Sequence, residues 1–273
     1  MSAPGGERFR VPSDAPFYVS FGILGGSYIV LILALLIADV FYTTPQHVMQ
    51  ALNSPEIRYA IKLSLISCTL TTILSLWVAV PLGYLLARHK FPGMGLIDAI
   101  LDIPIVLPPL VIGLSLLILF QAPPLRALER FFPVTYAIPS VILAQFAVAC
   151  AFAVRTMRVT FEQINPRGEQ VALTLGCSRS QAFWRVALPE ARRGLLTAAT
   201  LAWARSLGEF GPILIFSGAT RMKTEVLSTT VFLELSVGHI ETAVAVSLLM
   251  IAAAFAALTL LRTVGSERLE AFT

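Results

Sequence analysis

A polar segment interrupts the apolar sequence of this chain at Glu169-Gln170-Val171-Ala172-Leu173-Thr174-Leu175-Gly176 and continues to Val186-Ala187-Leu188-Pro189. Long apolar stretches precede and follow it. It lies within the longest polar loop of the sequence, residues 155–193, which holds seven arginines. A compact segment of this kind between membrane-buried helices predicts a surface on which a partner docks.

The composition is that of a membrane protein. Of 273 residues, 56% are hydrophobic and only 13% are charged, which is too apolar for a soluble domain. About 20 apolar residues in a helix cross a hydrocarbon core of about 30 Å, and helices satisfy their own backbone hydrogen bonds in lipid. The sequence therefore predicts an all-α polytopic membrane protein with six transmembrane helices. They are expected over 17–41, 63–87, 103–125, 131–154, 194–218 and 242–261.

The basic residues orient these helices. With the N-terminus in the cytoplasm, thirteen Lys and Arg residues fall on the cytoplasmic side and six outside, as the positive-inside rule expects. The net charge of +4 therefore reflects topology and gives no support to nucleic-acid binding. We expect a flexible tail over 1–16, a transmembrane domain over 17–262 and a short tail over 263–273, both tails cytoplasmic. The first apolar stretch exceeds the roughly 7–15 residues of a signal-peptide core, so it is predicted to be a retained helix.

Several catalytic motifs are missing from the sequence. The chain contains no Gly-Lys dipeptide and hence no P-loop, and it lacks the HExxH, GxSxG and protein-kinase signatures. Its cysteines and histidines do not have the spacing of a zinc site. We therefore expect a protein that is not an enzyme, has no catalytic residues or metal site, and does not hydrolyse nucleotide by itself.

The third apolar stretch carries Pro104, Pro108 and Pro109, followed by Gly113. Proline removes a backbone donor and clashes with the preceding turn, so this helix is predicted to be kinked or broken. Broken helices at membrane depth are tolerated where they line a cavity or pack against protein. The prolines are therefore candidates for a translocation path, and a kink that serves packing alone is the alternative.

The fifth apolar stretch contains two ionisable residues, Arg205 and Glu209. Charged side chains at membrane depth cost roughly 2.5–3.5 kcal/mol each and usually face a cavity or a partner. At positions i and i+4 the two share a helix face and can pair. They form either a structural ion pair or part of a path on which Arg205 attracts an anion and Glu209 repels it. Gly208 and Gly211 beside them suit a helix packed closely at a subunit interface around a pore, so they too are candidates for the path, and ordinary helix packing is the alternative.

Local signals divide the polar loop into two short helices. Residues 168–175 are predicted to be helical and to end at Gly176, and 178–187 are predicted to form a second helix that Leu188-Pro189 stops. Two short helices joined at a glycine make a compact unit that fits a groove on a partner. A plain connecting loop is the alternative.

This segment resembles the EAA loop of ABC importer permeases. The family pattern runs Glu-Ala-Ala, three residues, Gly, nine residues, Ile, any residue, Leu-Pro, and the spacing from Gly176 to Leu188-Pro189 matches it. Gln170 and Val171 stand where the family has Glu and the first Ala, whereas Glu169 stands one residue earlier. The resemblance implies that a separate ATPase contacts a set of coupling residues. They are Glu169, Gln170, Ala172, Gly176, Val186, Leu188 and Pro189.

Three other segments resemble the molybdate, tungstate and sulfate branch of that family. Leu82-Gly83-Tyr84-Leu85-Leu86-Ala87-Arg88, with Phe91-Pro92-Gly93 after it, is similar to the end of the branch's second span. Asp102-Ile103-Pro104-Ile105-Val106-Leu107-Pro108-Pro109 is similar to its proline-rich third segment. Ala204-Arg205-Ser206-Leu207-Gly208-Glu209-Phe210-Gly211 is similar to its most recognisable stretch.

The resemblance implies a permease subunit of an ATP-driven importer in the cytoplasmic membrane, working by alternating access on a tetrahedral oxyanion. Molybdate or tungstate is the expected substrate, and sulfate or thiosulfate is the alternative. An ion-driven secondary transporter and a non-transporting scaffold are the alternative classes. The implied partners are an ABC ATPase dimer, an external substrate-binding protein, and a second permease copy or a sister permease. ATP would be bound by the ATPase, so no cofactor is expected in this chain.

Overall fold

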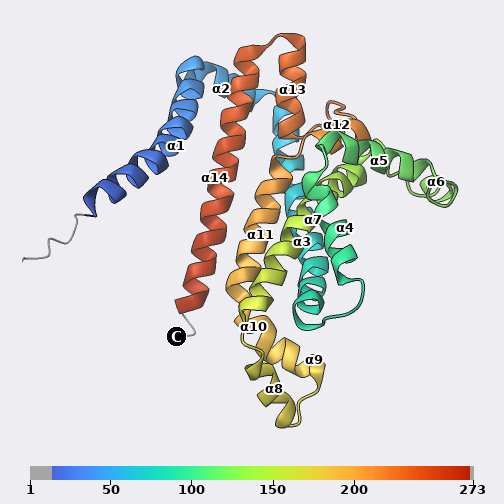
Figure 1. Ribbon diagram of the computed structural model, residues 1–273. Coiled ribbons are helices and arrows are strands. Elements are labelled where there is room, and N and C mark those ends of the chain that lie inside the picture. The colour runs from blue at the N-terminus through green and yellow to red at the C-terminus, as the bar shows by residue number, and fades with distance from the viewer. Residues whose placement is uncertain (1–13, 271–273) are drawn as a thin grey trace, which may run out of the picture. The chain divides into compact units, whose positions relative to one another are not determined.

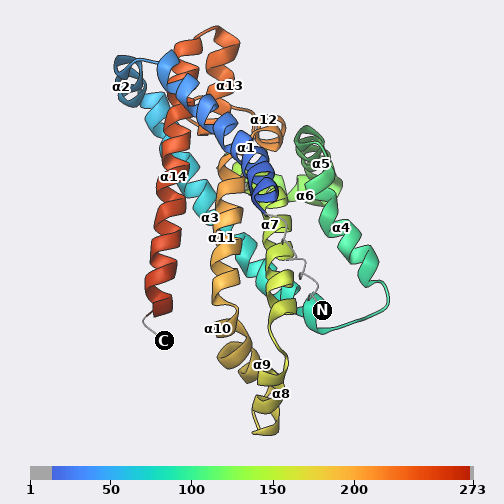
Figure 2. The same cartoon turned by 60° about the vertical axis from the view of Figure 1, so that its left-hand side comes forward.

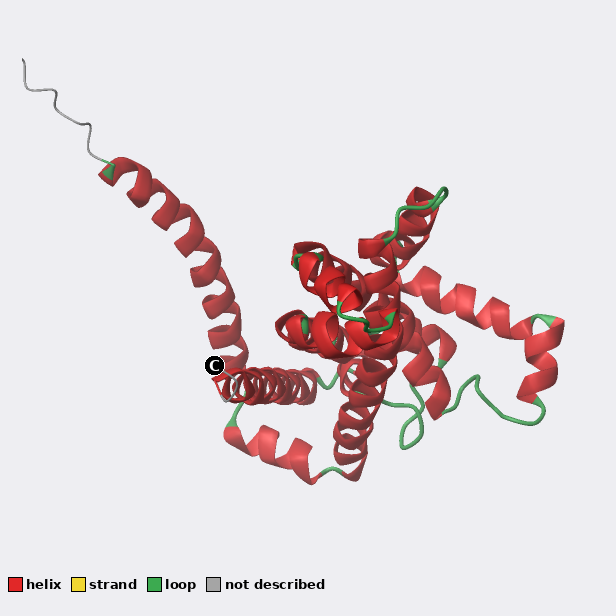
Figure 3. Ribbon diagram, turned by 90° about the horizontal axis from the view of Figure 1, so that it is seen from below, coloured by secondary structure: helices red, strands yellow, loops and turns green. Residues whose placement is uncertain are grey.

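The computed structural model describes residues 14–270, and every regular element in that range is a helix (Figures 1 and 3). The predicted all-α fold class is confirmed. By their contacts the residues form two compact units, 1–44 and 45–273, which are described in turn. Most of the predicted N-terminal tail lies outside the described residues.

The first unit contains α1 (Ala15–Tyr42), which is apolar on every side. Its stretch Phe17–Tyr42 is long enough to cross a membrane and has a mean hydropathy of 2.5. No described side chain of this helix is buried. A helix that is hydrophobic all round and not covered by protein is suited to lipid. The first predicted span is therefore confirmed as a helix of membrane-crossing length.

The second unit is built around α3 (Pro55–Arg88) and α7 (Ile138–Gln163), which pack against each other and against α11 (Arg192–Leu207) (Figure 2). The core between them includes the fully buried side chains of Met157 and Phe161. Both α3 and α7 are long and apolar enough to cross a membrane. The predicted second span, 63–87, lies within α3, whereas the predicted fourth span, 131–154, begins seven residues before α7 and ends nine residues before it does.

Gly83 allows α3 and α7 to approach closely. A Cβ at this position would lie 2.8 Å from the backbone nitrogen of Arg158 and 2.9 Å from the Cβ of Met157. Both distances are shorter than van der Waals contact allows. The glycine is therefore required by the packing of two helices and not by a turn.

A second core lies at the end of the unit opposite the polar loop. There α2 (Pro45–Asn53), α13 (Leu227–Val237) and the first part of α14 (Ile240–Glu270) pack together (Figure 1). Leu227 is completely buried in this core. Residues 263–270, predicted as part of a tail, continue α14 because no proline interrupts the helix there.

The helix lengths do not reproduce the predicted count of six spans. Among the described residues, four helices are long and apolar enough to cross a membrane, or five if α4 (Met94–Val106) and α5 (Pro109–Gln121) form one bent span. The predicted fifth span, 194–218, is divided into α11 and α12 (Gly211–Phe216). Gly208 caps the end of α11, and Pro212 is the second residue of α12, so neither piece reaches the roughly 20 residues that one straight span needs.

The third predicted span, 103–125, is broken as its prolines indicate. The axes of α4 and α5 differ by 112°. Leu107 and Pro108 are extended because the proline that follows each of them disfavours the helical conformation. Pro104 is accommodated inside α4, which starts well before residue 103. A short helix, α6 (Pro123–Glu129), follows α5.

Four short helical pieces project beyond the ends of α7 and α11 (Figures 1 and 2). They are α8 (Arg167–Thr174), α9 (Arg179–Ala182), the π-helical turn η1 (Phe183–Ala187) and α10 (Leu188–Glu190). We call residues 167–190 the projecting segment. It contains all the residues that the sequence predicts to contact an ATPase.

Candidate functional site

The first helix of the projecting segment forms and ends as predicted. Gly176 has φ 89°, a left-handed conformation that favours glycine. Its N–H donates to the carbonyl of Leu173 at 3.1 Å, and the N–H of Cys177 donates to that of Ala172 at 3.0 Å. This pair of bonds is a Schellman motif, so the prediction that Gly176 ends the helix is confirmed.

The second helix begins with a capping box. The Gln181 N–H donates to Ser178 Oγ at 3.2 Å, and the Ser178 N–H donates to Gln181 Oε1 at 2.8 Å. The predicted stop at Leu188-Pro189 is wrong, because α9, η1 and α10 follow one another without interruption. The Leu188 N–H bonds to the carbonyl of Phe183, five residues back. This wide π turn gives room to a proline ring that would clash in a regular α-helix.

The projecting segment exposes large apolar side chains. Leu175 is 80% exposed and Trp184 is 63% exposed. Exposed apolar residues on a small polar unit mark a contact surface, and tryptophan is frequent at the centre of such surfaces. Gln170, Gly176 and Pro189 are exposed as well. These three predicted coupling residues are accessible to a partner.

The other predicted coupling residues support the segment from inside. Ala172 is buried, whereas Val186 and Leu188 are half-buried. A Cβ at Gly168 would lie 3.3 Å from Val186 Cγ1, so α8 packs closely on η1. Glu169 is only 8% exposed, and its carboxylate is bound within the chain.

Arg88 and Tyr84, both on α3, hold that carboxylate. Sequence reasoning assigned no role in the site to either residue. One local signal was available, because Glu169 and Ala172 lie three residues apart and therefore share a face of α8. If Ala172 is buried, Glu169 on the same face is expected to be buried as well, and a buried carboxylate needs a cationic partner.

The proline-rich segment and the stretch 204–211 meet where α5 packs on α12 (Figure 1). A Cβ at Gly211 would lie 2.8 Å from the Cβ of Pro109, and a Cβ at Gly113 would lie 2.7 Å from the Cα of Pro212. Each glycine therefore packs directly against a proline of the other helix. These reciprocal contacts join two parts of the chain that the sequence singles out separately as candidates for a path.

Arg205 and Glu209 form an ion pair, with Arg205 Nη1 2.9 Å from Glu209 Oε2. The carboxyl side chain is 1% exposed, whereas that of Arg205 is 30% exposed and its guanidinium lies over the ring of Phe152 at 5.7 Å. Gly208, between them, is the residue at which α11 ends. The glutamate is therefore enclosed by protein, and the arginine is the partly open member of the pair.

The family of binding-protein-dependent transport system inner membrane components matches residues 79–270. The chain belongs to this family. It is therefore a permease subunit of an ABC importer, a multi-pass membrane protein, and a transport subunit rather than an enzyme.

The permease is similar to oxyanion permeases of bacteria and archaea. It is 33% identical to the sulfate transport system permease protein CysT of Escherichia coli (strain K12), over 80% of each chain. It is 34% identical to the molybdate/tungstate transport system permease protein WtpB of Pyrococcus abyssi, over 70% of this chain and 74% of that one. Its fold matches a chain of a bacterial alginate ABC transporter in complex with a periplasmic protein, with a TM-score of 0.68, 18% identity, and coverage of 91% and 94%.

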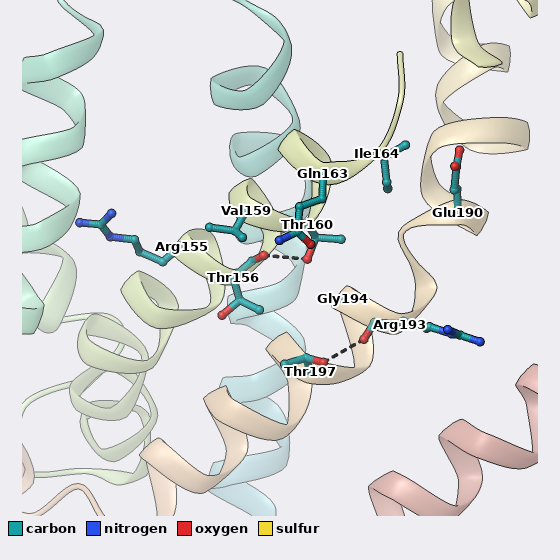
Figure 4. Close-up of a pocket in the computed structure, with 10 residues that line it drawn as sticks. All are labelled: Arg155, Thr156, Val159, Thr160, Gln163, Ile164, Glu190, Arg193, Gly194 and Thr197. Carbon is teal, nitrogen blue, oxygen red and sulfur yellow. Dashed lines mark hydrogen bonds between the residues drawn. The ribbon is translucent and has the colours of Figure 1, made fainter. Parts of the chain in front are cut away.

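A cavity of ≈ 740 Å³ opens between α7 and α11 of the permease (Figure 4). The hydroxyls of Thr156, Thr160 and Thr197 lie along it, and each donates to a backbone carbonyl of its own helix. Arg155 and Arg193 flank the cavity, but their guanidinium groups point away from each other in Figure 4. Because neither arginine directs its charge inward, the cavity does not by itself select an anion.

Metal ligands do not gather in the described part of the permease. Among residues 14–270, no group of three or more His, Cys, Asp and Glu side chains is placed to hold a metal ion. Cys68, Cys150 and Cys177 are free thiols.

Proposed function

We propose that this permease is the membrane subunit of an ATP-driven importer for a tetrahedral oxyanion, with molybdate or tungstate as the expected substrate. The main support for this proposal is the projecting segment. Its spacing from Gly176 to Leu188-Pro189 is that of the ABC importer permeases, and it exposes apolar side chains on two short helices. A secondary transporter driven by an ion gradient has no need of such a surface.

The relatives support the substrate class. The molybdate/tungstate permease of Pyrococcus abyssi and a probable molybdenum permease of Haloferax volcanii, at 34% and 31% identity, favour molybdate or tungstate. The sulfate permease of Escherichia coli, at 33% identity, favours sulfate or thiosulfate as the second candidate. All of these anions are tetrahedral, so the relatives support a ligand of this shape and negative charge whichever of the anions is transported.

The proposed partners follow from the same assignment. An ABC ATPase dimer binds ATP in the cytoplasm, so the permease itself needs no cofactor. An external substrate-binding protein delivers the anion, and a second permease copy or a sister permease completes the path. Two identical subunits would be related by a twofold axis. In this topology both termini and the projecting segment lie in the cytoplasm.

The mechanism we propose is a rigid-body switch between inward-open and outward-open states. Closure of the ATPase dimer brings the two projecting segments together. The movement tilts the membrane helices to which those segments are joined. ATP hydrolysis then separates the ATPase subunits and returns the helices to their first position.

The substitution Gly176→Trp tests the docking of the ATPase. It places a bulky side chain on the exposed surface at a left-handed position, where L side chains are strained. We expect the ATPase to be lost when the permease is purified. The matched control is Gly238→Trp, at a glycine with the same φ of 89° and open space around it at the opposite end of the unit. Full retention of the ATPase by Gly176→Trp would contradict the docking assignment.

Elemental analysis of cells that lack the permease tests the substrate. The cells are grown on trace molybdate and tungstate, and their molybdenum and tungsten contents are measured together with sulfate uptake. A sharp loss of either metal with sulfate uptake intact is the expected result. Unchanged metal content with impaired sulfate uptake would transfer the assignment to the second candidate.

A further inference from the structure

Arg88, the last residue of α3, binds three parts of the chain at once. Its Nε donates to Glu169 Oε1 at 2.9 Å, and its Nη2 lies 2.8 Å from the same oxygen. Its Nη1 donates to the backbone carbonyls of Phe161 at 2.8 Å and Ile164 at 3.2 Å. The planar fork of the guanidinium thus joins the end of α3, the end of α7 and the first turn of α8.

Tyr84, one turn earlier on α3, completes the cluster. Its hydroxyl donates to Glu169 Oε2 at 2.6 Å, so both carboxylate oxygens are occupied by donors from α3. Its ring packs edge-on against Phe161 of α7 and Phe183 of η1, with centroid distances of 5.4 and 4.8 Å. We call Tyr84, Arg88 and Glu169 the clamp.

The clamp is the main connection between α8 and the membrane helices. The backbone of α8 otherwise packs chiefly on η1 and α9, which belong to the same projecting segment. The side chains of Arg88 and Glu169 are only 12% and 10% exposed, so water screens their attraction little. A force applied to α8 therefore reaches α3 and α7 through these contacts.

We propose that Arg88 is a positioning residue that transmits movement of the projecting segment to α3 and α7, with Glu169 and Tyr84 as its partners. This inference rests on the proposed function. It assigns Glu169 to a contact within the permease, and it leaves the polar contact with the ATPase at this end of α8 to the exposed Gln170. Buried ion pairs contribute little net stability but can fix one geometry, which is the property that a transmitting joint requires.

The test compares variants of the complete complex of permease, ATPase and binding protein in proteoliposomes, with molybdate and sulfate as probes. The variants are Arg88→Gln, Arg88→Lys and Tyr84→Phe. The control is Lys90→Gln, which removes a positive charge two residues after Arg88 at an exposed side chain outside the projecting segment, where residues 14–270 offer no ion-pair partner. Three quantities are measured: co-purification of the ATPase, anion transported per ATP hydrolysed, and stimulation of ATP hydrolysis by the binding protein.

We expect Arg88→Gln to retain the ATPase and to transport roughly tenfold less anion per ATP, within the range of known coupling energies. Arg88→Lys keeps the charge but not the fork, so it should fall between the control and Arg88→Gln. A merely structural role would lower the yield and thermal stability of the complex while leaving anion transported per ATP unchanged. That result would overturn the inference.

Tyr84→Phe decides the question if Arg88→Gln does not assemble, because it removes one hydroxyl and keeps the packed ring. Reduced transport per ATP in this variant supports the clamp, and an unchanged ratio overturns it. Failure of the unaltered permease to co-purify with any ATPase would instead refute the proposed function. The two failures are therefore distinguishable.

Discussion

Replacement of Trp184 by alanine should weaken the binding of the ATPase strongly. A tryptophan side chain buries roughly 150–250 Å² when it is covered, and since 63% of Trp184 is exposed, docking can cover about 95–160 Å² more. At about 25 cal/mol per Å², that area corresponds to about 2.4–4 kcal/mol. Because 1.4 kcal/mol is a factor of ten, the affinity should fall by about 50- to 700-fold.

The assay is a titration of the ATPase that co-purifies with the permease against permease in lipid nanodiscs. The matched control is Trp77→Ala on α3, because Trp77 is 77% exposed but lies within a membrane-crossing helix, away from the projecting segment. The control should bind the ATPase as the unaltered permease does. If Trp184→Ala binds as tightly as the control, the exposed apolar side chains of the segment are not the docking surface.

Three other predictions, one of them with a matched control variant, depend on local packing and charge. Gly83→Ala should lower the melting temperature in detergent, since overpacking costs about 1–3 kcal/mol and the gain in helix preference is at most about 1 kcal/mol. Gly25→Ala should raise the melting temperature, because a Cβ at this position meets no atom within 4 Å and only the gain in helix preference remains. Equal changes of melting temperature in the two variants would contradict the packing argument. Burial raises the pKa of Glu225, so its contribution to stability is complete below the ordinary carboxyl pKa and is lost as the pH rises through the raised value. Glu225→Gln should therefore flatten the fall in melting temperature as the pH rises above the ordinary carboxyl pKa, and an unchanged slope would exclude this carboxyl as its source. Glu209→Gln should reduce anion uptake while the ATPase still co-purifies, and unchanged uptake would remove Glu209 from the transport cycle.

Features set by neighbouring residues could be predicted from the sequence. The end of α8 at Gly176 and the break before Pro109 depend on φ preferences and missing N–H groups, which are properties of one or two residues. The start of the second short helix likewise depends on a capping box within four residues. These are the elements for which prediction and structure agree most closely.

Features set by distant residues could not be predicted. Glu169 is held by Arg88, which lies 81 positions earlier, and no local pattern specifies that partner. The division of the predicted fifth span into α11 and α12 has a local cause at Gly208 and Pro212 and a distant one at Pro109. Its apolar composition is continuous enough for one helix, but the close contact of Gly211 with Pro109 favours a separate short helix against α5.

Glu169 and Glu209 are both buried but differ in how many contacts hold their carboxylates, and that difference indicates which parts move together. Glu169 accepts hydrogen bonds at both carboxylate oxygens from Arg88 and Tyr84, so rotation of α8 against α3 would break several bonds at once. Glu209 has an ion pair with Arg205, but its Oε2 accepts no hydrogen bond, and the pair lies beside the break between α11 and α12. Fewer bonds therefore oppose a change in the angle between α11 and α12. A displacement of the projecting segment is therefore expected to carry α3 and α7 as one body and to be absorbed at the break after Gly208.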